Sequence, residues 1–68
     1  MIGFADKVKY VRERLQLSQE RFASLLGVSF ATVNRWERGH SLPTYTAQVK
    51  FDEFCKNNDI VFNQEENL

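Results

Sequence analysis

The sequence predicts an all-α fold of four helices followed by a short extended C-terminal tail. Apolar residues recur every three or four positions over most of the chain, which is the period of a helix with one buried face. Only three glycines and one proline occur, too few for a turn-rich β fold. With 68 residues, 43% of them hydrophobic, the chain has the length and the apolar content of one small domain.

The predicted helices span residues 4–15, 19–26, 30–38 and 44–57. They form a domain of residues 1–58, and residues 59–68 form a separate acidic tail.

The first two helices follow from an apolar stripe and from capping signals. Four apolar residues recur at helical spacing with charged residues between them: Phe4, Val8, Val11 and Leu15. Ser18 then caps the second helix, and Glu20 lies in its first turn, where the helix dipole favours an acid. Gly27 ends this helix because glycine adopts a positive φ without a steric penalty.

The third and fourth helices carry equivalent signals. Ser29 caps the third helix, Val33 and Trp36 are its inward pair, and Gly39 stops it. Pro43 or Thr44 opens the fourth helix. Its apolar face consists of Ala47, Phe51 and Phe54, and the pair Asn57-Asn58 is a left-handed stop.

The tail begins with an apolar segment, Ile60-Val61-Phe62, which is extended in our interpretation. Two arrangements compete for it. The segment folds back onto Phe51 and Phe54, or two copies of the chain pair as antiparallel strands, so that Ile60, Val61 and Phe62 form a homodimer contact. We favour the first arrangement because it needs no partner.

Composition excludes several classes of protein. No apolar run reaches the roughly 18 residues of a membrane span, and the N-terminus lacks the apolar centre of a signal peptide. Cys55 is the only cysteine and His40 the only histidine, so we expect no disulfide and no metal site. With no glycine-rich phosphate loop and no activated nucleophile, we expect a cytoplasmic protein that is not an enzyme and takes no cofactor.

The formal net charge is zero, but the charges are unevenly distributed. Up to Phe51, eight basic residues face four acidic ones, a net charge of +4. From Asp52 onward, one basic residue faces five acidic ones, a net charge of −4. A basic body with an acidic tail is an asymmetry typical of interaction with a charged partner, although scattered solvated charges are the simpler interpretation.

Two short helices joined by a tight turn containing glycine form the helix-turn-helix pattern. The stretch SQERFASLLGVSFATVNRWERG resembles this motif in the phage-repressor and Cro-like family, also called the XRE family. The residues that carry the resemblance are Gln19, Ala23, Gly27, Val33 with Trp36, Glu37-Arg38-Gly39 and Pro43. It extends over about residues 4–43, and the combined spacing is far more specific than a single glycine turn.

The resemblance implies a lambda-repressor-like DNA-binding domain whose third helix enters the major groove of double-stranded DNA. It implies sequence-specific binding by a small transcription regulator, either a repressor or an antitoxin-like protein. The implied base-reading residues are Ser29, Phe30, Ala31, Asn34 and Arg35. The implied phosphate contacts are Ser18, Gln19, Thr32, Arg38, His40, Ser41 and Thr44.

Arg35 is the best candidate for a two-point contact to guanine, and Asn34 for adenine or a phosphate. Phe30 departs from the family pattern, where a polar residue, often glutamine, is common. It contacts a thymine methyl, packs on the domain, or packs on another protein, and the sequence does not separate these readings. A protein-interaction module that keeps this scaffold without binding DNA is therefore the alternative function.

The resemblance also implies an ion pair. In relatives, an arginine seven positions before the glutamine pairs with the glutamate at the end of the third helix. Arg12 and Glu37 occupy these positions. A pair between them would tie the first helix to the third, while Arg12 on a phosphate is the alternative.

Overall fold

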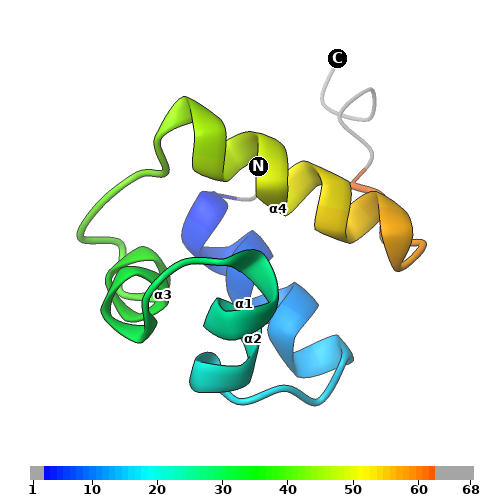
Figure 1. Ribbon diagram of the computed structural model, residues 1–68, viewed down its shortest axis with the longest axis horizontal. Helices are drawn as coiled ribbons and strands as arrows, with labels where there is room; N and C mark the ends of the chain where they lie inside the picture. The colour runs from blue at the N-terminus through cyan, green and yellow to red at the C-terminus, as the bar shows by residue number, and fades with distance from the viewer. Residues whose placement is uncertain (1–2, 63–68) are drawn as a thin grey trace.

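The computed structural model describes residues 3–62, and over this range the chain forms four α-helices and no strand. They are α1 (Phe4–Arg14), α2 (Gln19–Leu26), α3 (Phe30–Glu37) and α4 (Tyr45–Asn57), shown in Figure 1. The all-α prediction is confirmed. The first and third helices each end one residue earlier than predicted, and the fourth begins one residue later.

Side chains cap three of the helices, at Ser18 and Ser29 as the sequence predicts and also at Thr44. The hydroxyl oxygens of Ser18, Ser29 and Thr44 each accept a hydrogen bond from the backbone amide three residues later, at 3.0, 3.1 and 3.2 Å. Each such cap stabilises its helix by about 1 kcal/mol. Thr44 is therefore the cap of α4 and not its first helical residue.

The end of α4 differs from the prediction. Asn57 is helical, Asn58 has φ −110°, and the left-handed residue is Asp59, with φ +58°. The side-chain amide of Asn58 instead donates to the carbonyl of Phe54 at 2.8 Å. The left-handed position thus falls one residue later, and the backbone amide of Ile60 turns back to the Cys55 carbonyl at 2.9 Å.

The core lies where the four helices meet. Its fully buried side chains include Val8, Val11, Phe22, Val33 and Phe51. Trp36 is also buried, as expected of an inward residue of α3. The ring of Phe4 meets both Trp36 and Phe51 edge-on, with centroids 5.2 Å apart in each pair, so the start of α1 is fixed against α3 and α4.

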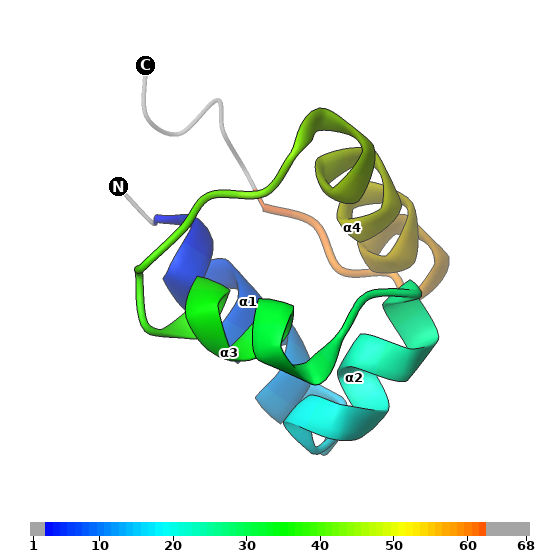
Figure 2. The same cartoon turned by 60° about the vertical axis from the view of Figure 1, so that its left-hand side comes forward.

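The segment after α4 folds back onto the domain. Figure 2 shows it passing between α1 and α4. Ile60 is 5% exposed and joins the core, and the ring of Phe62 lies edge-on to Tyr10 at 5.8 Å. The segment therefore folds back as favoured, and it lines one hollow with Phe51, but the aromatic partner of Phe62 is Tyr10 of α1 and not Phe51 or Phe54. Of the three residues predicted as a homodimer contact, Val61 alone is largely exposed, at 80%. The rest of the predicted tail, 63–68, lies outside the described residues.

Candidate nucleic-acid interface

The turn between α2 and α3 sets the angle of the motif. Gly27 has φ +76°, and the backbone amide of Val28 closes the end of α2 by donating to the Ala23 carbonyl at 3.0 Å. Ala23 is 2% exposed, and α3 packs against both α2 and α1. Figure 2 shows α2 and α3 meeting at this turn. The arrangement is a helix-turn-helix in which α3 rests on the other two helices.

The two sides of α3 differ in chemistry. Val33 and Trp36 point into the core and are 0% and 3% exposed. On the opposite side, Ala31 and Arg35 are exposed. Phe30 lies about 60° around the helix from Val33 and is 49% exposed at the start of α3, while Asn34 and Thr32 are partly exposed. The predicted base-reading residues are therefore all at least partly accessible, on α3 and at its N-cap Ser29.

Hydrogen bonds order the first turn of α3. The hydroxyls of Ser29 and Thr32 are 2.8 Å apart and bond to each other, while Ser29 also accepts from the Thr32 backbone amide. The Arg35 guanidinium donates to the Thr32 hydroxyl at 3.4 Å. This last contact is long and exposed, so it restrains Arg35 only weakly.

A second network ties α3 to α1. The Arg12 guanidinium donates to both carboxylate oxygens of Glu37, with Nε–Oε2 at 2.7 Å and Nη2–Oε1 at 3.1 Å. It also donates to the Leu17 carbonyl at 3.0 Å. The Glu37 side chain is 4% exposed and that of Arg12 20%. The hydrogen bond to Glu37 raises the pKa of Arg12 despite partial burial.

Gln19 extends this network to α2. Its side-chain amide nitrogen donates to Glu37 Oε1 at 3.0 Å, and its amide oxygen accepts from the side chain of Asn34 at 3.2 Å. The sequence suggested Gln19 as a donor to phosphate. In the structure its amide instead faces α3, with one N–H left for another acceptor. The sequence pattern gave no sign of this because the partners lie 15 and 18 positions away.

A shallow hollow of about 360 Å³ adjoins the accessible side of α3. It brings together four of the predicted contact residues, Thr32, Arg35, Ser41 and Thr44. The rest of its lining is apolar: Val28, Trp36, Leu42 and Ala47. The hydroxyls of Thr32 and Thr44 also take part in hydrogen bonds within the chain, so Arg35 and Ser41 are the side chains there with the most capacity left for an anionic group. Arg38 and His40 are exposed and are not part of its lining, and Ser18 lies at the start of α2.

Two exposed apolar residues near this hollow were missed by sequence reasoning. Leu42 is 81% exposed and Tyr45 is 85% exposed. A signal for Tyr45 was present, because it falls outside the apolar stripe of Ala47, Phe51 and Phe54 in the same helix. Both residues extend the accessible surface from α3 to the start of α4.

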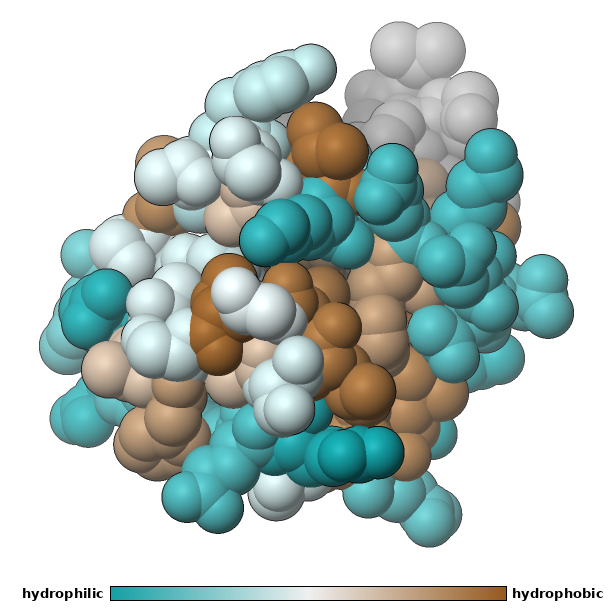
Figure 3. All heavy atoms as spheres, in the orientation of Figure 1, coloured by the Kyte–Doolittle hydropathy of each residue, from teal (hydrophilic) through white to brown (hydrophobic). Residues whose placement is uncertain are grey.

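Apart from Leu42 and Tyr45, an apolar area lies between α2 and α4. In Figure 3, brown side chains gather in the middle of the face, with teal ones around them. A hollow there is lined by Leu25, Leu26, Lys50, Glu53, Phe54 and Asn57, and Leu25 is 46% exposed.

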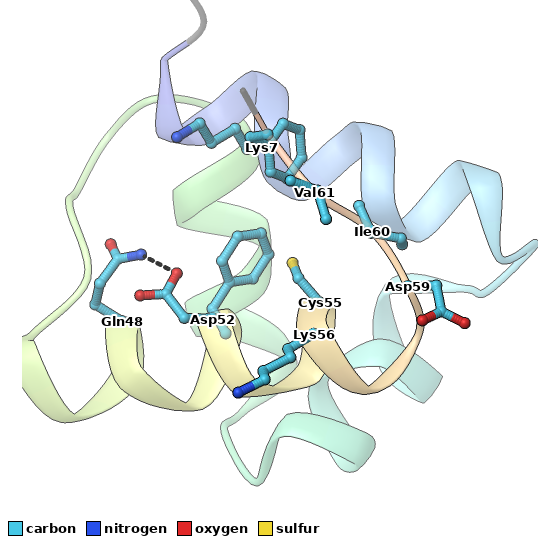
Figure 4. A pocket seen from close by; sticks show the side chains of 10 residues that line it. Lys7, Gln48, Asp52, Cys55, Lys56, Asp59, Ile60 and Val61 are labelled. Atoms are coloured by element: carbon cyan, nitrogen blue, oxygen red, sulfur yellow. Dashed lines mark hydrogen bonds between the residues drawn. The ribbon is translucent and has the colours of Figure 1, made fainter. Parts of the chain in front are cut away.

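A further hollow, of about 710 Å³, lies between α4, α1 and the folded-back segment (Figure 4). The Gln48 amide donates to the Asp52 carboxylate at its edge, at 2.9 Å. Burial and the nearby Asp52 charge raise the pKa of the Cys55 thiol to about 11, which makes it a poor nucleophile at neutral pH. Within residues 3–62, no three histidine, cysteine or acidic side chains are grouped to hold a metal ion.

Over the same described part of the chain, none of the helices has the length and apolar character needed to cross a membrane.

Comparison with known proteins agrees with this geometry. The model of a helix-turn-helix family matches residues 8–54. The Type II methyltransferase M.SsoII of Shigella sonnei is 46% identical to this chain over 45 residues. The match covers 62% of this chain but 12% of the methyltransferase, so the chain spans a small part of that relative's length. No solved structure matches the chain significantly. Because the family model covers well over half of the sequence, the chain belongs to the XRE-type helix-turn-helix family of DNA-binding regulators.

Proposed function

We propose that this protein binds double-stranded DNA sequence-specifically and reads the major groove with α3. The observation that carries the proposal is the position of Arg35. Its guanidinium is exposed on the side of α3 opposite the buried Val33 and Trp36, and its one hydrogen bond within residues 3–62 is long. A guanidinium in this state keeps its paired donors for the O6 and N7 atoms of guanine.

The neighbouring elements support the same orientation. The capped start of α2 at Ser18 presents backbone amides to which a phosphate binds readily. Ser41 and Thr44 line the hollow between α3 and the start of α4, where they would contact a phosphate of the DNA backbone. Contacts of this kind would fix the register of α3 in the groove without contributing sequence information.

The proposed role is that of a small cytoplasmic transcription regulator, a repressor or an antitoxin-like protein, that acts by binding without catalysis or a cofactor. One copy reads only a few base pairs, so two copies would occupy half-sites about 34 Å apart. A homodimer through residues 60–62 stays a prediction, and the burial of Ile60 leaves Val61 as its exposed contact.

Selection from a random duplex library tests the proposal. The wild-type chain is expected to enrich a defined site, with affinity that falls as salt is added. Arg35→Ala is expected to weaken binding to that site by about 5- to 150-fold and to relax the preference at one guanine, as the loss of a two-point base contact does. Leu25→Ala is the control, because Leu25 is also exposed but belongs to α2 and lines the hollow between α2 and α4.

If no sequence is enriched and the weak binding disappears with salt, the proposal is wrong. The exposure of Leu42 and Tyr45 then favours the second candidate, a protein-interaction module on the same scaffold. Under that reading, Arg35→Ala leaves binding of the protein partner intact, and substitution of Leu42 or Tyr45 abolishes it.

A further inference from the structure

The first turn of α3 presents apolar side chains at the surface where polar ones are expected. Phe30 is 49% exposed, and the adjacent Ala31 is exposed as well. Within residues 3–62, Phe30 is not among the buried core residues, and its ring pairs with no other aromatic ring. Packing on its own domain therefore covers only about half of the side chain, and the other half is open to a partner.

The polar groups beside Phe30 are already engaged. The Ser29 hydroxyl caps α3, and it bonds to the Thr32 hydroxyl, which in turn accepts from Arg35. Asn34 and Arg35, the side chains with donors suited to base edges, lie in the next turn. The surface of α3 thus carries two apolar side chains, Phe30 and Ala31, beside the engaged hydroxyls of its first turn, and Asn34 and Arg35 in the next turn.

Only one type of group in the major groove is apolar. It is the C5-methyl group of a pyrimidine, which thymine carries and which 5-methylcytosine carries at the same position. A phenyl ring gains from contact with this methyl and cannot make a two-point hydrogen bond to any base edge. We propose that Phe30 is a specificity-determining residue that contacts the C5-methyl group of a pyrimidine in the major groove, with the small Ala31 leaving room for the approach. This inference rests on the proposed DNA-binding function.

The spacing along α3 gives the proposal a position in the site. Phe30 precedes Arg35 by five residues, which is about 7.5 Å along a helix axis at 1.5 Å per residue. Neighbouring base pairs are about 3.4 Å apart. The methylated pyrimidine is therefore expected about two base pairs from the guanine bound by Arg35.

The test uses the duplex selected by the wild-type chain. Each thymine is replaced singly by uracil, which removes the methyl group and keeps the hydrogen-bonding edge. One replacement, about two base pairs from the Arg35-dependent guanine, is expected to weaken wild-type binding about fourfold, the effect of exposing one buried methyl group. At that position, the affinities for duplexes with cytosine and with 5-methylcytosine are also compared. Tighter binding to the 5-methylcytosine duplex shows that the protein contacts the methyl group itself.

The variant Phe30→Ala is expected to bind the thymine and uracil duplexes equally well while keeping its dependence on the guanine. Phe30→Leu, which retains an apolar contact, is expected to keep part of the difference in affinity between the thymine and uracil duplexes. Leu25→Ala is expected to keep all of that difference. Circular dichroism melting establishes that each variant folds.

Three outcomes would overturn the inference. Equal wild-type binding to the thymine and uracil duplexes at every position refutes methyl contact while leaving the DNA-binding function intact. The same uracil sensitivity in Phe30→Ala and in the wild type assigns the contact to another residue. Failure of the wild type to select any duplex refutes the proposed function and this inference together, and leaves a protein partner as the alternative for the exposed apolar residues.

Discussion

At the scale of single residues, the raised pKa of the Cys55 thiol makes the free energy of unfolding depend on pH. Burial, with a contribution from the Asp52 carboxylate, raises its pKa from 9.0 to about 11. The unfolded thiol therefore loses its proton first. The pKa of the thiol is thus higher in the folded chain than in the unfolded chain, so its contribution to the free energy of unfolding is fully present below pH 9. This contribution is lost as the pH rises from 9 through about 11.

Urea unfolding at pH 8 and at pH 11 measures this effect. Cys55→Ala is the control, because it removes the thiol and leaves the tyrosines and lysines that also titrate in this range. The wild type is expected to lose more stability than the variant between the two pH values. An equal loss in both proteins would mean that Cys55 titrates at its ordinary pKa in the folded chain.

Gln19 is predicted to position Asn34. Its amide joins the Asn34 side chain to the carboxylate of Glu37, at 3.2 and 3.0 Å. Gln19→Ala is expected to lower the free energy of unfolding by about 1–3 kcal/mol, because it leaves partly buried polar groups without these partners. In a double-mutant cycle with Asn34→Ala, the two losses should not add, with a coupling of at least about 0.5 kcal/mol. Additive losses in urea unfolding would show that the two side chains act independently.

At the scale of the helices, the ion pair of Arg12 and Glu37 holds α3 against α1. The Glu37 side chain is 4% exposed, so its charge depends on Arg12 and Gln19 for compensation. Arg12→Met is expected to destabilise the chain by about 3–5 kcal/mol, because it leaves a buried carboxylate without its cationic partner. For a domain of this size, such a loss approaches the total free energy of unfolding.

The double variant Arg12→Met with Glu37→Met separates the two explanations for that loss. Replacing both partners with apolar side chains of similar volume removes the buried charge, and the double variant should be much more stable than Arg12→Met alone. Thermal unfolding measures both variants. A double variant as unstable as Arg12→Met would indicate that the hydrogen bonds of the guanidinium, including the one to the Leu17 carbonyl, and not compensation of the Glu37 charge, hold the helices together.

The helices illustrate what local sequence predicts well. Ser18, Ser29 and Gly27 mark helix ends through bonds that reach no more than about four residues along the chain, so the signal and the structure lie in the same few positions. The residue with the left-handed backbone after α4 was misplaced, because Asn57, Asn58 and Asp59 tolerate that conformation about equally. Packing of Ile60 in the core selects Asp59 among them.

For the molecule as a whole, the sequence could not predict how side chains of one helix are oriented toward another helix. Placing Val33 and Trp36 inward needed only the helical period, and this located the exposed side of α3. The inward turn of Gln19 depends on the angle between α2 and α3, which no local pattern gives. The same holds for the hollow that brings Ser41 and Thr44 beside Arg35, because a loop and two helices form it together.

The segment after α4 determines whether the folded domain ends with that helix or extends through residues 60–62. Ile60 is 5% exposed and is part of the core, whereas its neighbour Val61 is 80% exposed. Ile60→Ala is expected to cost about 2–5 kcal/mol of stability, the range for truncating a buried aliphatic side chain, and Val61→Ala less than about 0.5 kcal/mol. Urea unfolding at several protein concentrations measures both variants. A loss of stability for Val61→Ala that grows with protein concentration would instead indicate that residues 60–62 join two copies of the chain, because the stability of a dimer depends on the concentration of its protomers.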